Sequence, residues 1–136
     1  MSDAGGRGPQ VDPREDLYRA ITTPDWWEAD AVPPRPRSAA FRKRKFSVNV
    51  ASEIGLEGAI RHLCSVLKCP DGGLVSFNCG FARQLGFDAR REIDEDYRDN
   101  TAHANVYYDG STNSLKSSAK RLASAEECQV VRSPRF

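Results

Sequence analysis

The sequence predicts a single α+β domain in which helices pack on a small mixed β-sheet. A length of 136 residues is ordinary for one domain. Segments with the two-residue period of half-buried strands alternate with segments of helical period. Some predicted strands also follow one another directly, as in α+β folds. We expect residues 1–12 to form a disordered tail, residues 13–132 the domain and residues 133–136 a flexible end.

The first third of the chain predicts short turns and a stiff proline segment. Residues 12–15 read Asp-Pro-Arg-Glu, with an N-cap and a proline at the first helical position. This pattern predicts a short helix over residues 13–21. Residues 23–28 repeat the pattern and predict a second turn. The prolines at positions 33, 34 and 36 end any helix that begins there.

The middle of the chain carries the clearest periodic segments. Residues 46–50 alternate apolar and polar side chains, which predicts a strand. Residues 56–67 place their apolar side chains on one helical face and predict an amphipathic helix. Residues 74–79 predict a second strand. Residues 81–86 predict a helical turn, with Gly86 at the position that requires a left-handed backbone.

The last third predicts three strands and a helix. Residues 87–93 predict a short strand, and residues 94–100 an acidic loop. Residues 103–108 predict the next strand. Ser114 is the expected cap of a helix with the apolar stripe Leu115, Ala119, Leu122 and Ala123. Residues 128–131 predict a final strand, paired at an edge or beside the core.

Composition excludes a strong general attraction to nucleic acid or membranes. Lys and Arg number 20 against 19 Asp and Glu, which gives a net charge of +1. No apolar run approaches the roughly 20 residues of a membrane helix, and the first ten residues have no apolar segment of a signal peptide. We expect a soluble cytoplasmic protein that makes no membrane contact.

The four cysteines predict reduced core thiols, and we expect no metal and no cofactor. Cys64, Cys69, Cys79 and Cys128 fall in apolar periodic segments, without the spacing of a disulfide framework. The alternative is zinc held by the first three cysteines and His62, but Cys64 has a helical position where structural zinc prefers a tight loop knuckle.

A basic run between two aromatic residues is typical of a loop that contacts phosphates. Cations hold a phosphate backbone, and aromatic faces stack on bases. Basic residues that enter a strand also serve as solvated edges that discourage association of sheets. The candidate phosphate-binding residues are Arg42, Lys43, Arg44 and Lys45.

His103 is the candidate acid or base of an enzyme. It is one of two histidines, lies at the start of a predicted strand, and titrates near neutral pH. If the protein is an enzyme, the expected catalytic residues are His103, Arg19, Ser47 and Asp99. The alternative is a half-buried strand histidine bonded to a neighbouring carboxylate or carbonyl.

Adjacent tryptophans and nearby prolines favour a docking surface for another protein. On a helix, neighbours point about 100° apart, so Trp26 and Trp27 cannot both enter one narrow core stripe. Rigid apolar groups lose little entropy on docking. The candidate partner-binding residues are Trp26, Trp27, Pro33, Pro34 and Pro36. The alternative is that both rings cover one end of the core.

Two resemblances add to this reading. The chain resembles an uncharacterised group of short bacterial proteins in four motifs: Leu-Tyr-Arg at 17–19, Ser-x-Ala-Phe at 38–41, Phe-Ser-Val at 46–48 and Ala-His-Ala-x-Val at 102–106. This resemblance implies a bacterial protein that acts with a partner encoded nearby. Arg19 and Ser47 also resemble the cleft residues of ADP-ribosyltransferase-like proteins, although a matching late glutamate is not present in a predicted strand.

The sequence therefore supports two hypotheses of different class. The preferred one is an accessory protein that docks a protein partner through its aromatic and proline-rich face. The alternative is a small enzyme or binding protein for a phosphate-bearing ligand, either a nucleotide or nucleic acid. The enzyme requires His103, an arginine and a carboxylate to converge on one cavity.

Overall fold

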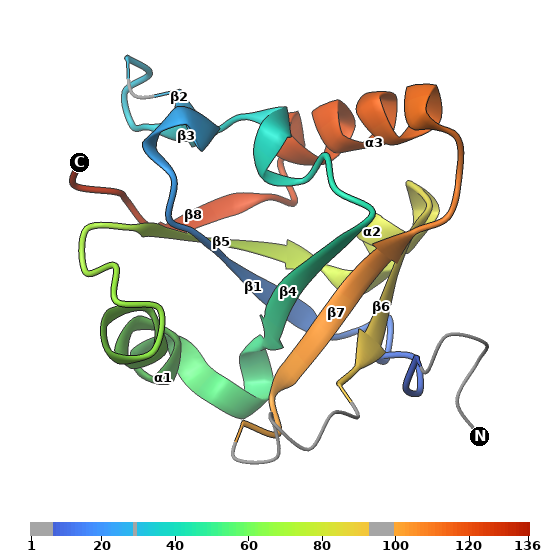
Figure 1. The fold of residues 1–136 in the computed structure, drawn as a ribbon, viewed down its shortest axis with the longest axis horizontal. Helices are drawn as coiled ribbons and strands as arrows, with labels where there is room; N and C mark the ends of the chain where they lie inside the picture. The colour runs from blue at the N-terminus through green and yellow to red at the C-terminus, as the bar shows by residue number, and fades with distance from the viewer. Residues whose placement is uncertain (1–6, 29, 93–99) are drawn as a thin grey trace.

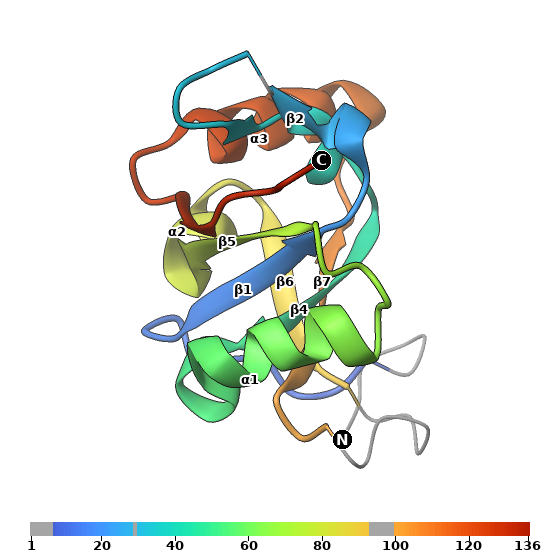
Figure 2. The same ribbon diagram turned by 90° about the vertical axis from the view of Figure 1, so that its left-hand side faces the viewer.

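The computed structural model describes residues 7–28, 30–92 and 100–136 and has the predicted α+β class. Its main element is a six-stranded sheet with strand order β6-β7-β4-β1-β5-β8. Helices α1 and α3 lie on opposite sides of this sheet, as both views show (Figure 1, Figure 2). The strands are β1 (Asp16–Ile21), β4 (Lys45–Val50), β5 (Gly73–Asn78), β6 (Phe87–Arg91), β7 (His103–Tyr108) and β8 (Gln129–Arg132).

Three α-helices and a small hairpin complete the described chain. The helices are α1 (Ala51–Ser65), α2 (Cys79–Gln84) and α3 (Thr112–Ser124). The hairpin pairs β2 (Trp27–Glu28) with β3 (Arg35–Pro36), between the 3₁₀ turns η1 (Pro24–Trp26) and η2 (Ser38–Ala40). The predicted strands and helices from residue 46 onward are all present. The cap of α3 is Ser111, whose hydroxyl accepts from the Ser114 N–H, rather than Ser114 itself.

The predicted helix over residues 13–21 is wrong, because residues 16–21 form β1 at the centre of the sheet. Leu17, Arg19 and Ile21 are buried on one face of this strand, while Tyr18 and Ala20 are partly buried on the other. This two-residue alternation fits a strand with both faces covered. Sheet pairing on both sides of β1 overrides the local helix-start signal at Asp12.

The position of β1 also explains why the sheet is antiparallel in every described pair and not mixed. Helix α1 connects β4 to β5, and these two strands run in the same direction. β1 lies between them and is antiparallel to both. β1 therefore separates two strands of the same direction, and the described strands form no parallel pair.

Each side of the sheet has its own apolar cluster. The larger cluster lies on the side of α3 and includes Phe46, Phe77, Phe87 and Leu122. The smaller cluster, on the side of α1, consists of Ala59, Leu63 and Leu74. Because α1 contributes few buried side chains, part of this second sheet face remains accessible for a site.

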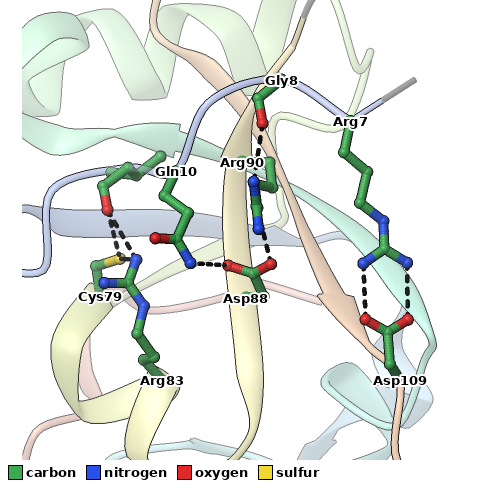
Figure 3. Close-up of polar contacts among 9 residues, drawn as sticks. Arg7, Gly8, Gln10, Cys79, Arg83, Asp88, Arg90 and Asp109 are labelled. Atoms are coloured by element: carbon green, nitrogen blue, oxygen red, sulfur yellow. Dashed lines mark hydrogen bonds and ion pairs between the residues drawn. The ribbon is translucent and has the colours of Figure 1, made fainter. Parts of the chain in front are cut away.

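Residues 7–12, expected to be disordered, lie against the edge strand β6. The Val11 N–H donates to the carbonyl of Ala89 at 2.9 Å, and Val11 is 1% exposed. Arginines hold the segment in place (Figure 3): Arg83 donates to the carbonyl of Val11 at 2.9 Å, and Arg7 pairs with both oxygens of Asp109 at 2.7 Å. One buried valine, hydrogen bonds to its backbone and one ion pair therefore hold a segment of low hydrophobicity in place.

The carboxyl-terminal end is also hydrogen-bonded. The Arg135 N–H donates to the carbonyl of Asp71 at 2.8 Å, and the Arg135 guanidinium donates to the carbonyl of Pro70. The expected flexible end, residues 133–136, thus lies beside the turn that follows α1.

Candidate functional site

A groove of about 530 Å³ opens on the side of the sheet that α1 covers only in part. Pockets of this size accept small organic ligands. Residues of β1, β4, β7, α1 and the loop around Trp26 form its walls. The lining residues are Tyr18, Arg19, Ala20, Thr22, Trp26, Lys43, Lys45, Phe46, Ser47, Val48, Asn49, His62, Val66, Leu67 and His103.

The strand register explains why residues distant in the sequence meet here. Tyr18 pairs with Asn49, and Asn49 pairs with His103, so the three form a row across β1, β4 and β7. Side chains in register share one face of a sheet. Ser47 lies two residues from Asn49 on β4 and has the same orientation. The register therefore places Ser47 and His103 on the groove side of the sheet.

Arg19 reaches the groove where β1 and β4 cease to pair. These strands pair at Leu17 and Tyr18 only. Beyond that point the Arg19 guanidinium donates to the carbonyls of Ser47 (3.2 Å) and Ala40 (3.2 and 3.3 Å). Hydrogen bonds from the guanidinium thus take the place of backbone hydrogen bonds where β1 and β4 no longer pair.

The charge of Arg19 is buried and has no carboxylate partner among the described residues. The residue is 8% exposed, and its guanidinium lies 4.7 Å from the ring centroid of Phe46. Burial lowers the pKa of Arg19 to about 10, so the group remains a cation at neutral pH. A buried cation of this kind costs free energy unless an anion compensates it.

The four residues of the basic run, 42–45, point alternately into the groove and away from it. Lys43 and Lys45 line the groove, and the Lys43 ammonium lies 4.7 Å from the Trp26 ring centroid. Arg44 points elsewhere and donates to the carbonyls of Tyr108 and Gly110 before α3. Arg42 is exposed and is not among the groove residues. Half of the predicted phosphate-binding run therefore shares one cavity with Arg19.

His103 is buried, with 5% of its surface exposed, and lies beside Glu92. Its Nδ1 is 3.7 Å from Oε2 of Glu92, which also accepts from the side chain of Asn105. Burial lowers the pKa of His103, and the charges of His62 and Lys45 act in the same direction, while Glu92 opposes them. The structure thus places this strand histidine beside a carboxylate, but buried rather than half-buried and at 3.7 Å rather than at hydrogen-bond distance, and the same ring lines the groove.

His62 is the second histidine at the groove, and it comes from α1. It is half-buried, and burial lowers its pKa as well. The sequence predicts His62 only as an alternative zinc ligand, and the structure places it in the same groove as His103, the other histidine of the chain. Tyr18, Asn49 and Leu67 also line the groove and were not expected there, because their roles depend on strand register and helix placement.

The predicted aromatic and proline platform is divided between the core and the surface. Trp27 is 2% exposed and donates its indole N–H to the carbonyl of Ile21 at 3.1 Å. It pairs with the buried Pro36 in the hairpin. Neither Trp27 nor Pro36 can belong to an exposed platform, since both are packed inside. Pro33 is exposed, Pro34 is half-buried, and the half-buried Trp26 faces the groove.

Two remaining expectations concern Asp99 and the cysteines. Asp99 lies outside the described residues. Cys79 is buried, and the other three cysteines are partly buried. Burial raises the pKa of Cys128 to about 12 and also raises that of Cys79, which keeps both as neutral thiols. Within residues 7–28, 30–92 and 100–136, no three His, Cys, Asp or Glu side chains form a metal-binding group.

Fold and site together define an α+β protein with a cationic groove on one face of an antiparallel sheet. The described part of the chain has no helix with the length and apolar character needed to cross a membrane. Comparisons with protein-family models, curated proteins and solved structures find no match. The function must therefore be inferred from the geometry of the groove.

Proposed function

We propose that this protein binds a phosphate-bearing organic molecule of nucleotide size in the groove. One observation supports this most strongly: Arg19, Lys43 and Lys45 line the cavity, and no aspartate or glutamate is among the described lining residues. A cavity whose charged lining side chains are all positive concentrates anions. Guanidinium and ammonium groups are the usual phosphate partners in proteins.

The other walls favour an organic ligand over a bare anion. Tyr18, Val66 and Leu67 present apolar surface along the groove. Val66 and Leu67 are 63% and 42% exposed, so a ligand would remove apolar area from water. A nucleotide combines a flat apolar base with a phosphate and matches both parts of the cavity.

Binding of adenosine 5′-monophosphate is expected, with adenosine binding at least ten-fold more weakly. A variant with Lys43→Gln and Lys45→Gln is expected to bind the nucleotide about ten-fold more weakly, because charged hydrogen bonds contribute about 1.5–3 kcal/mol when buried and less at exposed sites. Calorimetric titration at two salt concentrations measures both effects.

The matched control is Arg42→Gln, which removes a charge from the same run but outside the groove. Its affinity should stay within two- to three-fold of the wild type. Equal affinity for adenosine and its monophosphate, or equal losses in the control and the double variant, would show that the groove is not a phosphate site.

A second candidate function uses the loop of the β2–β3 hairpin. Val32 is 98% exposed and is followed by the exposed Pro33. A rigid apolar tip of this kind suits docking to a protein partner encoded nearby. Val32→Asp should then remove the partner that co-purifies from the native cells, and Lys43→Gln should retain it. An unchanged set of co-purified proteins in Val32→Asp would exclude this role.

A further inference from the structure

Both histidines of the chain line the phosphate groove, and they come from different elements. His62 lies near the end of α1, and His103 begins β7. The two imidazoles are close enough for the charge of His62 to act on His103. Two imidazoles beside a phosphate can serve as a general base and a general acid in one cavity.

The surroundings give the two rings different roles. Glu92 lies beside Nδ1 of His103, so it can orient this ring and stabilise the imidazolium that forms when the ring accepts a proton. His62 is half-exposed and can regain a proton from solvent. His103 is therefore suited to act as the base, and His62 as the acid.

The nearby cations suit a phosphoryl transition state. Arg19 and Lys45 share the groove with the two rings. They can stabilise the negative charge that develops on the non-bridging oxygens as phosphorus becomes five-coordinate. The positive charge of Lys45 also lowers the pKa of His103, which favours the neutral form of this ring and so its action as a base.

Resting on the proposed phosphate site, we propose that the groove cleaves ribonucleotide phosphodiesters by transesterification. His103 takes the proton of the 2′-hydroxyl, and O2′ forms a bond to phosphorus. The bond from phosphorus to O5′ breaks, and His62 donates a proton to the leaving O5′. The products are a 2′,3′-cyclic phosphate and a free 5′-hydroxyl, with no change of oxidation state. The 2′-hydroxyl supplies the nucleophile, which makes the substrate RNA and not DNA.

The test uses the full chain and the ribodinucleotide uridylyl-(3′,5′)-adenosine. We expect conversion to uridine 2′,3′-cyclic phosphate and adenosine, and none with the matching deoxyribonucleotide. His62→Asn and His103→Gln should each lower the rate about 100-fold or more. Binding of adenosine 5′-monophosphate by both variants is measured alongside, so that a lower rate of cleavage is separated from weaker binding, while Arg42→Gln, which lies outside the groove, should retain full activity.

The pH profile provides a second signature. Burial lowers the pKa of both histidines, with Lys45 adding to this effect at His103 and Glu92 opposing it. Arg19, with a pKa of about 10, remains a cation throughout the range. The acid must be protonated and the base neutral, so the rate should rise as the pH falls below 7, pass a maximum and then decline. A merely structural histidine would not produce this bell-shaped profile.

Three results would overturn the inference. One is a wild-type protein that binds the mononucleotide but leaves the ribodinucleotide intact, in which case the proposed binding function still stands. Another is equal cleavage of the deoxyribonucleotide. The third is a folded His62→Asn variant, verified by circular dichroism, that keeps the full rate. Failure to bind the mononucleotide at all would instead overturn the proposed function and this inference together.

Discussion

Replacing Trp27 by alanine is expected to lower the free energy of unfolding by about 3–5 kcal/mol. The indole is 2% exposed, and its N–H donates to the carbonyl of Ile21. A Cβ at Gly73 would lie 2.2 Å from Cζ2 of Trp27, so the ring fills the space over that glycine. The variant would lose a large apolar contact and leave a cavity between the hairpin and β5. Urea denaturation measures this loss.

Trp26→Ala is the matched control, since Trp26 is adjacent but only half-buried. We expect a loss of about 1 kcal/mol in unfolding free energy and weaker nucleotide binding, because Trp26 lies beside Lys43 and Arg19 in the groove. Similar stability losses in the two variants would contradict the different burial of the two rings. Unchanged stability of Trp27→Ala would contradict its place in the core.

Replacing Arg19 by methionine is expected to weaken nucleotide binding about 10- to 100-fold while changing the unfolding free energy by less than about 1 kcal/mol. Methionine keeps an unbranched apolar side chain at this position, but it loses the contacts of the guanidinium with the rings of Phe46 and Trp26. Its loss of hydrogen bonds to Ser47 and Ala40 destabilises the fold. Removal of a buried cation without a carboxylate partner among the described residues offsets that loss. Calorimetric titration and urea denaturation measure the two quantities.

Arg44→Met is the matched control, because it shows whether weaker nucleotide binding requires the loss of Arg19 or follows from the loss of any arginine. Arg44 also donates to backbone carbonyls, those of Tyr108 and Gly110, but it lies outside the groove lining. Its nucleotide affinity should therefore equal that of the wild type. If Arg19→Met binds the nucleotide normally, or if both variants weaken binding equally, Arg19 is not part of the phosphate site.

The local pattern of apolar residues predicted an element correctly where one face of that element is buried and the other is exposed. β4 alternates between buried and accessible side chains, as the sequence of residues 46–50 indicates. Helix α3 buries Leu115, Ala119, Leu122 and Ala123, which are the predicted stripe. In these segments the periodicity of apolar residues and the packing of the fold agree.

The local pattern predicted the wrong structure where a segment is held by hydrogen bonds to parts of the chain that are distant in the sequence. β1 follows a strong helix-start signal, yet it pairs with β4 and β5 on its two sides. The segment before it is ordered by contacts with β6 and with Asp109, about 80 to 100 residues away in sequence. Neither arrangement has a signature in the neighbouring residues, because the hydrogen-bonding partners are supplied by the tertiary fold.

The amino-acid sequence by itself determined the α+β class, most of the elements, and the candidates Arg19, Lys43, Lys45, Ser47 and His103. Only the tertiary structure decided that these five share a groove with His62, and that Arg44 and Trp27 do not. The reason is geometric: residue type sets the chemistry that a side chain can perform, but strand register and helix docking set its neighbours. β1, the strand that local pattern misassigned, places Arg19 beside β4 and so completes the cationic groove.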